Sequence, residues 1–216
     1  MRVPRFLLIG GTLAVLAHAA PADPEIVPRS GVTFEQLTLK AIPPYRARQR
    51  PDGRYETLRR PDLVAELRLV TGLALNERGA DLLPAPTPRI SCRYETYSVV
   101  DDAWFRDFND WFRDELRALD LKFRQQVWDC DDFSLSLNAF ADLALLLARD
   151  HPPPQLIGRL IVEQANPWGG TPAGGLHEVV IFRSQSAWHV VEPQTHTVTT
   201  LQSYPNRGFI QEILFN

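Results

Sequence analysis

The sequence predicts an α+β fold in which helices come first along the chain and an antiparallel sheet follows. Two observations support this order. Apolar residues recur at helical spacing in residues 104–116 and 133–147, whereas residues 177–182 and 188–191 are two short β-prone runs on either side of a short polar turn. With 216 residues, of which 44% are hydrophobic, the chain is long enough for one domain with a substantial core.

The first residues are typical of a secretory signal. Arg2 and Arg5 precede the short apolar run from Phe6 to Leu16, and Ala17-His18-Ala19 fits the cleavage rule of small residues. The sequence therefore predicts a signal peptide over residues 1–19 and a mature protein in the periplasm or outside the cell. The apolar run is too short for a stable span, so no membrane insertion is expected after cleavage.

Residues 20–90 are expected to form an N-terminal extension of unknown role. A pattern over residues 32–39 indicates a strand, and residues 61–71 indicate a helix that starts at Pro61 and stops at Gly72. Three prolines at 84, 86 and 88 mark the candidate boundary. Residues 91–216 are then expected to form a catalytic domain that opens with a β-prone stretch over residues 91–100.

An aromatic stripe follows this stretch. Trp104, Phe108, Trp111, Phe112 and Leu116 share one face of a predicted helix. Stacking of Trp104 or Trp111 on a carbohydrate is one interpretation, but the helical spacing favours a position in the core.

The stretch Asp129-Cys130-Asp131-Asp132-Phe133 places a thiol directly before the longest apolar helical pattern, which is apolar almost all round and is expected to be buried. Backbone N–H groups and the helix dipole favour an anion at a helix N-terminus. A thiolate is the nucleophilic form of cysteine, and a nearby histidine base promotes it. Cys130 is therefore the candidate nucleophile.

The region 177–192 offers the two partners that such a nucleophile needs. If Ser184 and Gln185 form a two-residue hairpin turn, His177 lies opposite Glu192 on one face of the sheet. His177 would then act as base and Glu192 would orient it. Residues 160–162 and 197–201 are expected to add strands, and the glycine-rich loop over residues 166–175 is expected to be a mobile rim or lid.

Several alternatives stay open at this point. A Cys92–Cys130 disulfide is common chemistry for two cysteines in an exported protein, and it would remove the nucleophile. Asp131 and Asp132 suit the first turn of any helix. A formal charge of −3 without a basic stripe makes nucleic acid a poor candidate as partner.

The Asp129 to Phe133 stretch, His177 opening a strand and Glu192-Pro193-Gln194 ending the next resemble the papain-like and transglutaminase-like cysteine peptidases. The bacterial periplasmic transglutaminase-like cysteine proteinases and the C-terminal protease domain of fungal agglutinins fit best, over residues 95–200. The bacterial branch usually carries Asp in place of Glu192.

The resemblance implies a papain-like or transglutaminase-like core, in which a buried helix carries the cysteine at its N-terminus and packs on an antiparallel sheet that carries the histidine and acid. It also implies a catalytic triad of Cys130, His177 and Glu192, and a Ca²⁺ site for which Asp129 and Asp131 are candidate ligands. The chemistry itself requires no cofactor.

The resemblance predicts an exported cysteine hydrolase, with a peptidase that acts through an acyl-enzyme on a protein or peptide substrate as the main expectation. The first alternative is a peptidoglycan peptide hydrolase or transamidase on the same scaffold. The second is a non-catalytic binding protein with a Cys92–Cys130 disulfide.

Overall fold

The computed structural model describes residues 42–77, 87–121 and 129–215. The expected signal peptide and the expected strand over residues 32–39 lie outside them. The described residues form the following helices and strands: β1 (Thr57–Arg59), α2 (Arg60–Thr71), β2 (Asn76–Glu77), β3 (Arg89–Cys92), β4 (Thr96–Ser98), α3 (Asp102–Ala118), α4 (Cys130–Leu146), β5 (Ile157–Glu163), β6 (Leu176–Arg183), β7 (Trp188–Glu192), β8 (Thr197–Thr200) and β9 (Ile210–Phe215).

The α+β class predicted from the sequence is confirmed, with a main sheet of strand order β2-β3-β9-β5-β6-β7-β8. The five strands from β9 to β8 pair antiparallel, whereas β2, β3 and β9 pair parallel. The sheet is therefore mixed and not purely antiparallel. The β-prone stretch over residues 91–100 contains the end of β3 and the whole of β4, of which β3 joins this sheet while β4 pairs with β1 in a separate ribbon.

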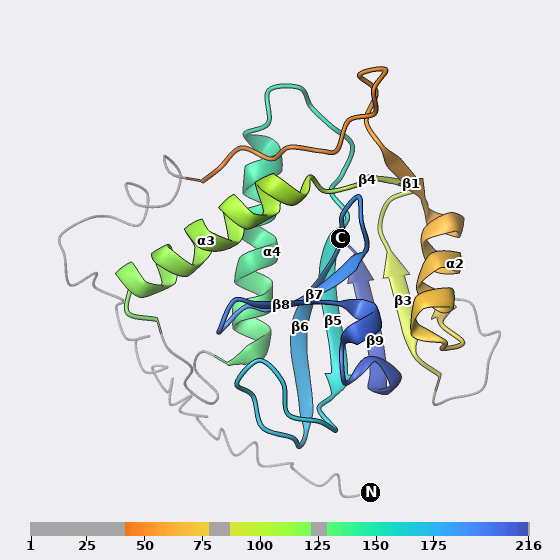
Figure 1. The fold of residues 1–216 in the computed structure, drawn as a ribbon, viewed down its shortest axis with the longest axis vertical. Helices are drawn as coiled ribbons and strands as arrows, with labels where there is room; N and C mark the ends of the chain where they lie inside the picture. The colour runs from red at the N-terminus through yellow and green to blue at the C-terminus, as the bar shows by residue number, and fades with distance from the viewer. Residues whose placement is uncertain (1–41, 78–86, 122–128, 216) are drawn as a thin grey trace, which may run out of the picture.

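Helices cover both faces of the main sheet (Figure 1). On one face α2 packs Leu63 and Leu67 into a core that includes Val179 and Ile181 of β6. On the other face α3 and α4 share a second core with the alternate residues Val180 and Phe182. Because successive side chains of a strand point to opposite faces, β6 contributes to both cores and is buried on both sides.

Residues 42–77 belong to the same packed body as the rest of the described chain. Tyr45 lies in the core under α3 and α4, and its hydroxyl hydrogen-bonds to Ser98 at 2.8 Å. Leu63 of α2 lies in the other core. The domain boundary at residue 90 thus stays a prediction. The described residues before it pack against those after it.

Local sequence explains where α2 begins and ends and where α3 begins. Pro61 occupies the first turn of α2, and Gly72 ends the helix in a left-handed conformation at φ 72°. The Asp101 side chain caps α3 by accepting from the backbone N–H of Trp104. Trp104 is fully buried and stacks on Phe108 with ring centroids 4.9 Å apart, so its role is in the core.

Helix α4 runs as predicted from Cys130, but one side of it is open. Phe133 and Leu137 are buried, whereas Leu135 is 51% exposed and Leu146 is 77% exposed. The expectation of a helix buried all round is therefore wrong in the described structure, because the sheet and α3 cover only part of its surface. None of the helices placed in the described ranges is long and apolar enough to cross a bilayer.

Candidate active site

Cys130 is the first residue of α4, where the sequence predicted it. Asp129 precedes it in an extended conformation and forms a capping box with Asp132, in which the Asp129 N–H donates to Asp132 Oδ2 at 3.1 Å. This box fixes the start of the helix at Cys130. The thiol therefore lies at the end of a 17-residue helix where the dipole favours negative charge.

His177 and Glu192 form a buried pair. His177 Nε2 donates to Glu192 Oε2 at 2.6 Å, and the side chains are 5% and 0% exposed. A carboxylate that accepts from one ring nitrogen fixes the orientation of the imidazole. The predicted association of these two residues is thus present in the structure.

The predicted register that led to this pair is wrong. Arg183 faces Trp188, and not Ser186, because the turn residues are Gln185 and Ser186 and the Ser184 N–H donates to the carbonyl of Ala187. The shift is two residues, an even number, so His177 and Glu192 stay on one face as diagonal neighbours. The long side chain of Glu192 spans this diagonal.

The charges at the site favour a protonated His177. Burial lowers the pKa of this imidazole, but hydrogen bonds to Cys130 and to Glu192, together with the charges of both, outweigh burial and raise the pKa to about 9. At neutral pH His177 is therefore an imidazolium between the Glu192 carboxylate and the Cys130 sulfur. This contact joins residues from α4, β6 and the end of β7.

Both cysteines are free in the structure, so the expected alternative of a Cys92–Cys130 disulfide is not present. They differ in environment. Burial raises the pKa of the Cys92 thiol to about 11, in spite of the nearby Arg60. Cys92 is therefore a thiol at neutral pH, and a poor nucleophile.

The acids beside Cys130 have separate roles. Asp132 serves the capping box. Asp129 and Asp131 each place a carboxylate oxygen within 4.8 Å of the Cys130 sulfur and of each other. Oxygen ligands at this spacing suit Ca²⁺. The calcium site nevertheless stays a prediction.

The glycine-rich loop over residues 166–175 was expected to be mobile, and it is instead tied to its surroundings. The Asn166 N–H donates to Asn206 Oδ1 at 2.7 Å, and Thr195 Oγ1 donates to the Gly169 carbonyl at 2.8 Å. Within the loop, Thr171 Oγ1 donates to Glu192 Oε2 at 3.4 Å. Thr171 was missed from the sequence, although Gly169-Gly170 is a dipeptide that favours a tight turn.

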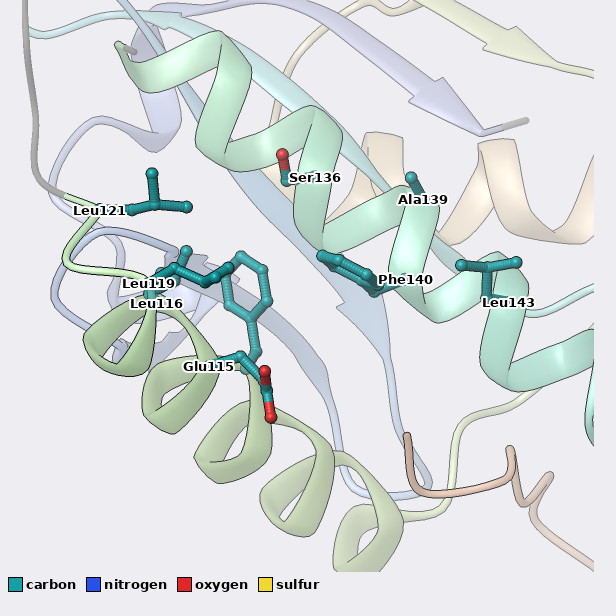
Figure 2. A pocket seen from close by; sticks show the side chains of 9 residues that line it. Glu115, Leu116, Leu119, Leu121, Ser136, Ala139, Phe140 and Leu143 are labelled. Carbon is teal, nitrogen blue, oxygen red and sulfur yellow. The ribbon is translucent and has the colours of Figure 1, made fainter. Parts of the chain in front are cut away.

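A separate apolar pocket of about 300 Å³ lies between α3 and α4 (Figure 2). Leu116 and Leu119 line it from one side, and Ala139, Phe140 and Leu143 of α4 line it from the other. It contains none of the three candidate catalytic residues.

Comparison with known proteins finds no matching family model and no matching curated protein. The solved structures that are similar to the chain include the following two. One is described as a complex of PSL1a with E64, at 16% identity and a TM-score of 0.47, covering 74% of this chain and 51% of that one. The other is Polyporus squamosus lectin bound to the human-type influenza-binding epitope Neu5Acα2-6Galβ1-4GlcNAc, at 15% identity and a TM-score of 0.47, covering 74% and 49%.

The chain thus spans about half the length of these similar chains. Their descriptions contradict the predicted exported peptidase and its protein substrate, because one names a lectin with a bound glycan and neither names a peptidase. The second alternative expected from the sequence is a non-catalytic binding protein. The disulfide expected in that alternative is absent, since Cys92 and Cys130 are free.

Proposed function

We propose that Cys130, His177 and Glu192 form a thiol-dependent acyl-transfer site. The observation that carries the proposal is the buried hydrogen bond of 2.6 Å from His177 to Glu192, on an imidazole that also hydrogen-bonds to Cys130. A nucleophile, a base in contact with it and a third group that orients the base are the parts that acyl transfer requires.

In the first half of the reaction the Cys130 thiolate attacks the carbonyl carbon of an amide and forms a tetrahedral oxyanion. Backbone N–H groups in the first turn of α4 are placed to stabilise that charge. His177 then gives its proton to the departing amine, and a thioester to Cys130 remains. In the second half the neutral imidazole removes a proton from water or from an acceptor amine, which attacks the thioester and releases the thiolate.

We further infer a papain-like or transglutaminase-like core around this site. The supporting features are the cysteine at the first position of α4, the packing of α4 on one face of β5 and β6, and the base and acid on adjacent antiparallel strands. Transamidation uses the same core and the same three groups, with an amine in place of water.

As substrate class we propose the amide bonds of peptidoglycan peptides, cleaved or transferred to an amine acceptor. The N-terminal sequence predicts export, and an exported enzyme would encounter peptidoglycan. Each such bond supplies the carbonyl carbon that a thiolate attacks and the amine that an imidazolium protonates.

The first test measures which cysteine is activated. The native protein is treated at pH 7 with substoichiometric iodoacetamide, and the labelled peptides are mapped by mass spectrometry. Cys130 should be alkylated at least tenfold faster than Cys92, since burial keeps Cys92 a thiol. Labelling with E64, the compound named with PSL1a, is expected at Cys130 as well.

The second test measures turnover of muropeptides, with and without an added amine. Cys130→Ala and His177→Ala should abolish product formation, and Glu192→Gln should reduce it without abolishing it, because Glu192 orients the base. Cys92→Ala is the matched control and should keep wild-type turnover. Equal labelling of both cysteines, or normal turnover by Cys130→Ala, would contradict the site and leave the non-catalytic binding protein.

A further inference from the structure

A tight turn of two glycines lies against the side chain of Glu192. Trp168 and Thr171 close the turn by donating to each other's carbonyls at 3.0 and 2.9 Å. Gly169 and Gly170 between them have φ values of 60° and 84°. This pair of left-handed residues is the pattern of a type I′ turn, which glycine adopts without strain.

The turn is anchored on both sides. On one side Thr195 Oγ1 donates to the Gly169 carbonyl at 2.8 Å. On the other the Trp168 ring meets the edge of Tyr204 with centroids 4.9 Å apart. Because Tyr204 is 2% exposed, it gives the turn a fixed wall to rest on.

The turn can lie against Glu192 only because residue 169 has no side chain. A Cβ atom there would lie 2.8 Å from Glu192 Cβ and 2.9 Å from its Cγ, closer than real Cβ contacts come. A Cβ atom at Gly170 would instead meet Thr195 Cγ2 at 3.3 Å. Of the two glycines, Gly169 is therefore the one that touches the acid.

The turn also completes the hydrogen bonds of the carboxylate. Oε2 accepts from Thr171 Oγ1 at 3.4 Å in addition to His177, and Oε1 accepts from the Gln194 N–H at 3.2 Å. The carboxylate is fully buried beneath these groups. A buried acid with three donors has one preferred orientation.

We propose that Gly169 and Thr171 are positioning residues of the acyl-transfer site, and that their turn holds the Glu192 carboxylate against His177. The expected effect on turnover rests on the proposed function, whereas the contact between the turn and Glu192 does not. A displaced carboxylate would leave the imidazole free to rotate away from the thiol, so turnover would fall while the cysteine itself was unchanged.

The test compares Gly169→Ala with Gly170→Ala. Both substitutions place a side chain at a left-handed position and strain the turn alike, but only the first puts a Cβ atom against Glu192. The primary readout is the far-downfield NMR resonance of the His177 ring N–H that is bonded to the carboxylate. This signal should move upfield or disappear in Gly169→Ala and stay in place in Gly170→Ala. Muropeptide kcat should fall at least tenfold in the first variant only, with KM nearly unchanged.

Thr171→Val tests the hydroxyl separately and covers the case in which Gly169→Ala does not fold. Its His177 N–H signal should shift, and Thr171→Ser should restore the signal and kcat. An unchanged His177 signal in Gly169→Ala or Thr171→Val would overturn the positioning role. If the signal shifts as expected but the wild type shows no thiol-dependent turnover, the positioning stands and the proposed function fails.

Discussion

At the residue scale, His177 joins the thiol on α4 to the acid at the end of β7. Its pKa of about 9 lies above the ordinary histidine value near 6.5, as a result of its contacts with Cys130 and Glu192. A group whose pKa rises on folding stabilises the folded state below its unfolded pKa and loses that contribution as the pH rises through the folded pKa.

We therefore expect the free energy of unfolding to fall between pH 6.5 and 9.5, by on the order of 3 kcal/mol from this residue. Urea denaturation at pH 6.5, 8 and 9.5 measures it. His177→Gln should flatten this dependence, and an equally steep curve in that variant would assign the dependence to other groups. The comparison starts at pH 6.5 because burial lowers the pKa of His196 to about 4, which adds the opposite slope at lower pH.

The candidate nucleophile could be predicted from the sequence because its signal is local. A single stretch contains Cys130, the acids that cap the helix, and the start of the apolar pattern. Thr171 could not be predicted in the same way, since its hydroxyl acts on Glu192, 21 residues further along. Only the folded loop brings them together.

At the element scale, the start of α4 depends on the capping box between Asp129 and Asp132. Asp132→Ala removes the acceptor of the Asp129 N–H and should cost about 1 kcal/mol of stability. Thermal unfolding followed by circular dichroism measures the loss. Asp131→Ala is the matched control, an acid in the same turn outside the box, and it should cost less. Equal losses in the two variants would mean that the charge, and not the box, stabilises the helix.

The β6–β7 hairpin shows where sequence reasoning fails at this scale. Ser184, Gln185 and Ser186 all suit a turn, and composition does not distinguish which pair occupies its centre. The Ser184 side chain decides it, because Ser184 Oγ lies 3.0 Å from His189 Nε2 and 3.1 Å from Ser186 Oγ, inside the fold. The predicted partner of His177 was right because the error in register was even.

At the scale of the whole molecule, the pocket between α3 and α4 places the carboxyl group of Glu115 among apolar side chains. Burial, with a smaller effect of Asp114, raises the pKa of Glu115. Its Oε2 is buried without a hydrogen-bond partner among the described residues. Figure 2 shows this side chain beside the apolar groups of the pocket.

Glu115→Gln should therefore raise the melting temperature at pH 7 by about 2 °C, because burial costs a neutral amide less desolvation free energy than it costs a carboxylate. The gain should vanish at low pH, where the wild-type carboxyl is protonated. Differential scanning calorimetry at pH 7 and pH 4 measures both. Asp114→Asn, which removes a charge from a more exposed neighbour, should change the melting temperature less. A gain of the same size at both pH values would contradict the argument.

The short apolar run in β6 predicted a strand, and its nearly unbroken burial shows that both of its faces are covered, by α2 on one side and α4 on the other. The open side of α4 was not foreseen, because its composition is as apolar there as on its buried face. Which apolar face is covered depends on neighbours far away in sequence. For the same reason β9 was not predicted at all.

The position of β9 has a consequence for how the chain is made. It lies between β3 and β5 and is the strand that both of them contact in the main sheet, yet residues 210–215 are synthesised after every other strand described here. Until they emerge from the ribosome, β3 and β5 each present an unpaired edge, which is a template for pairing with another chain. We therefore expect the nascent chain to be prone to aggregation until β9 has paired with β3 and β5.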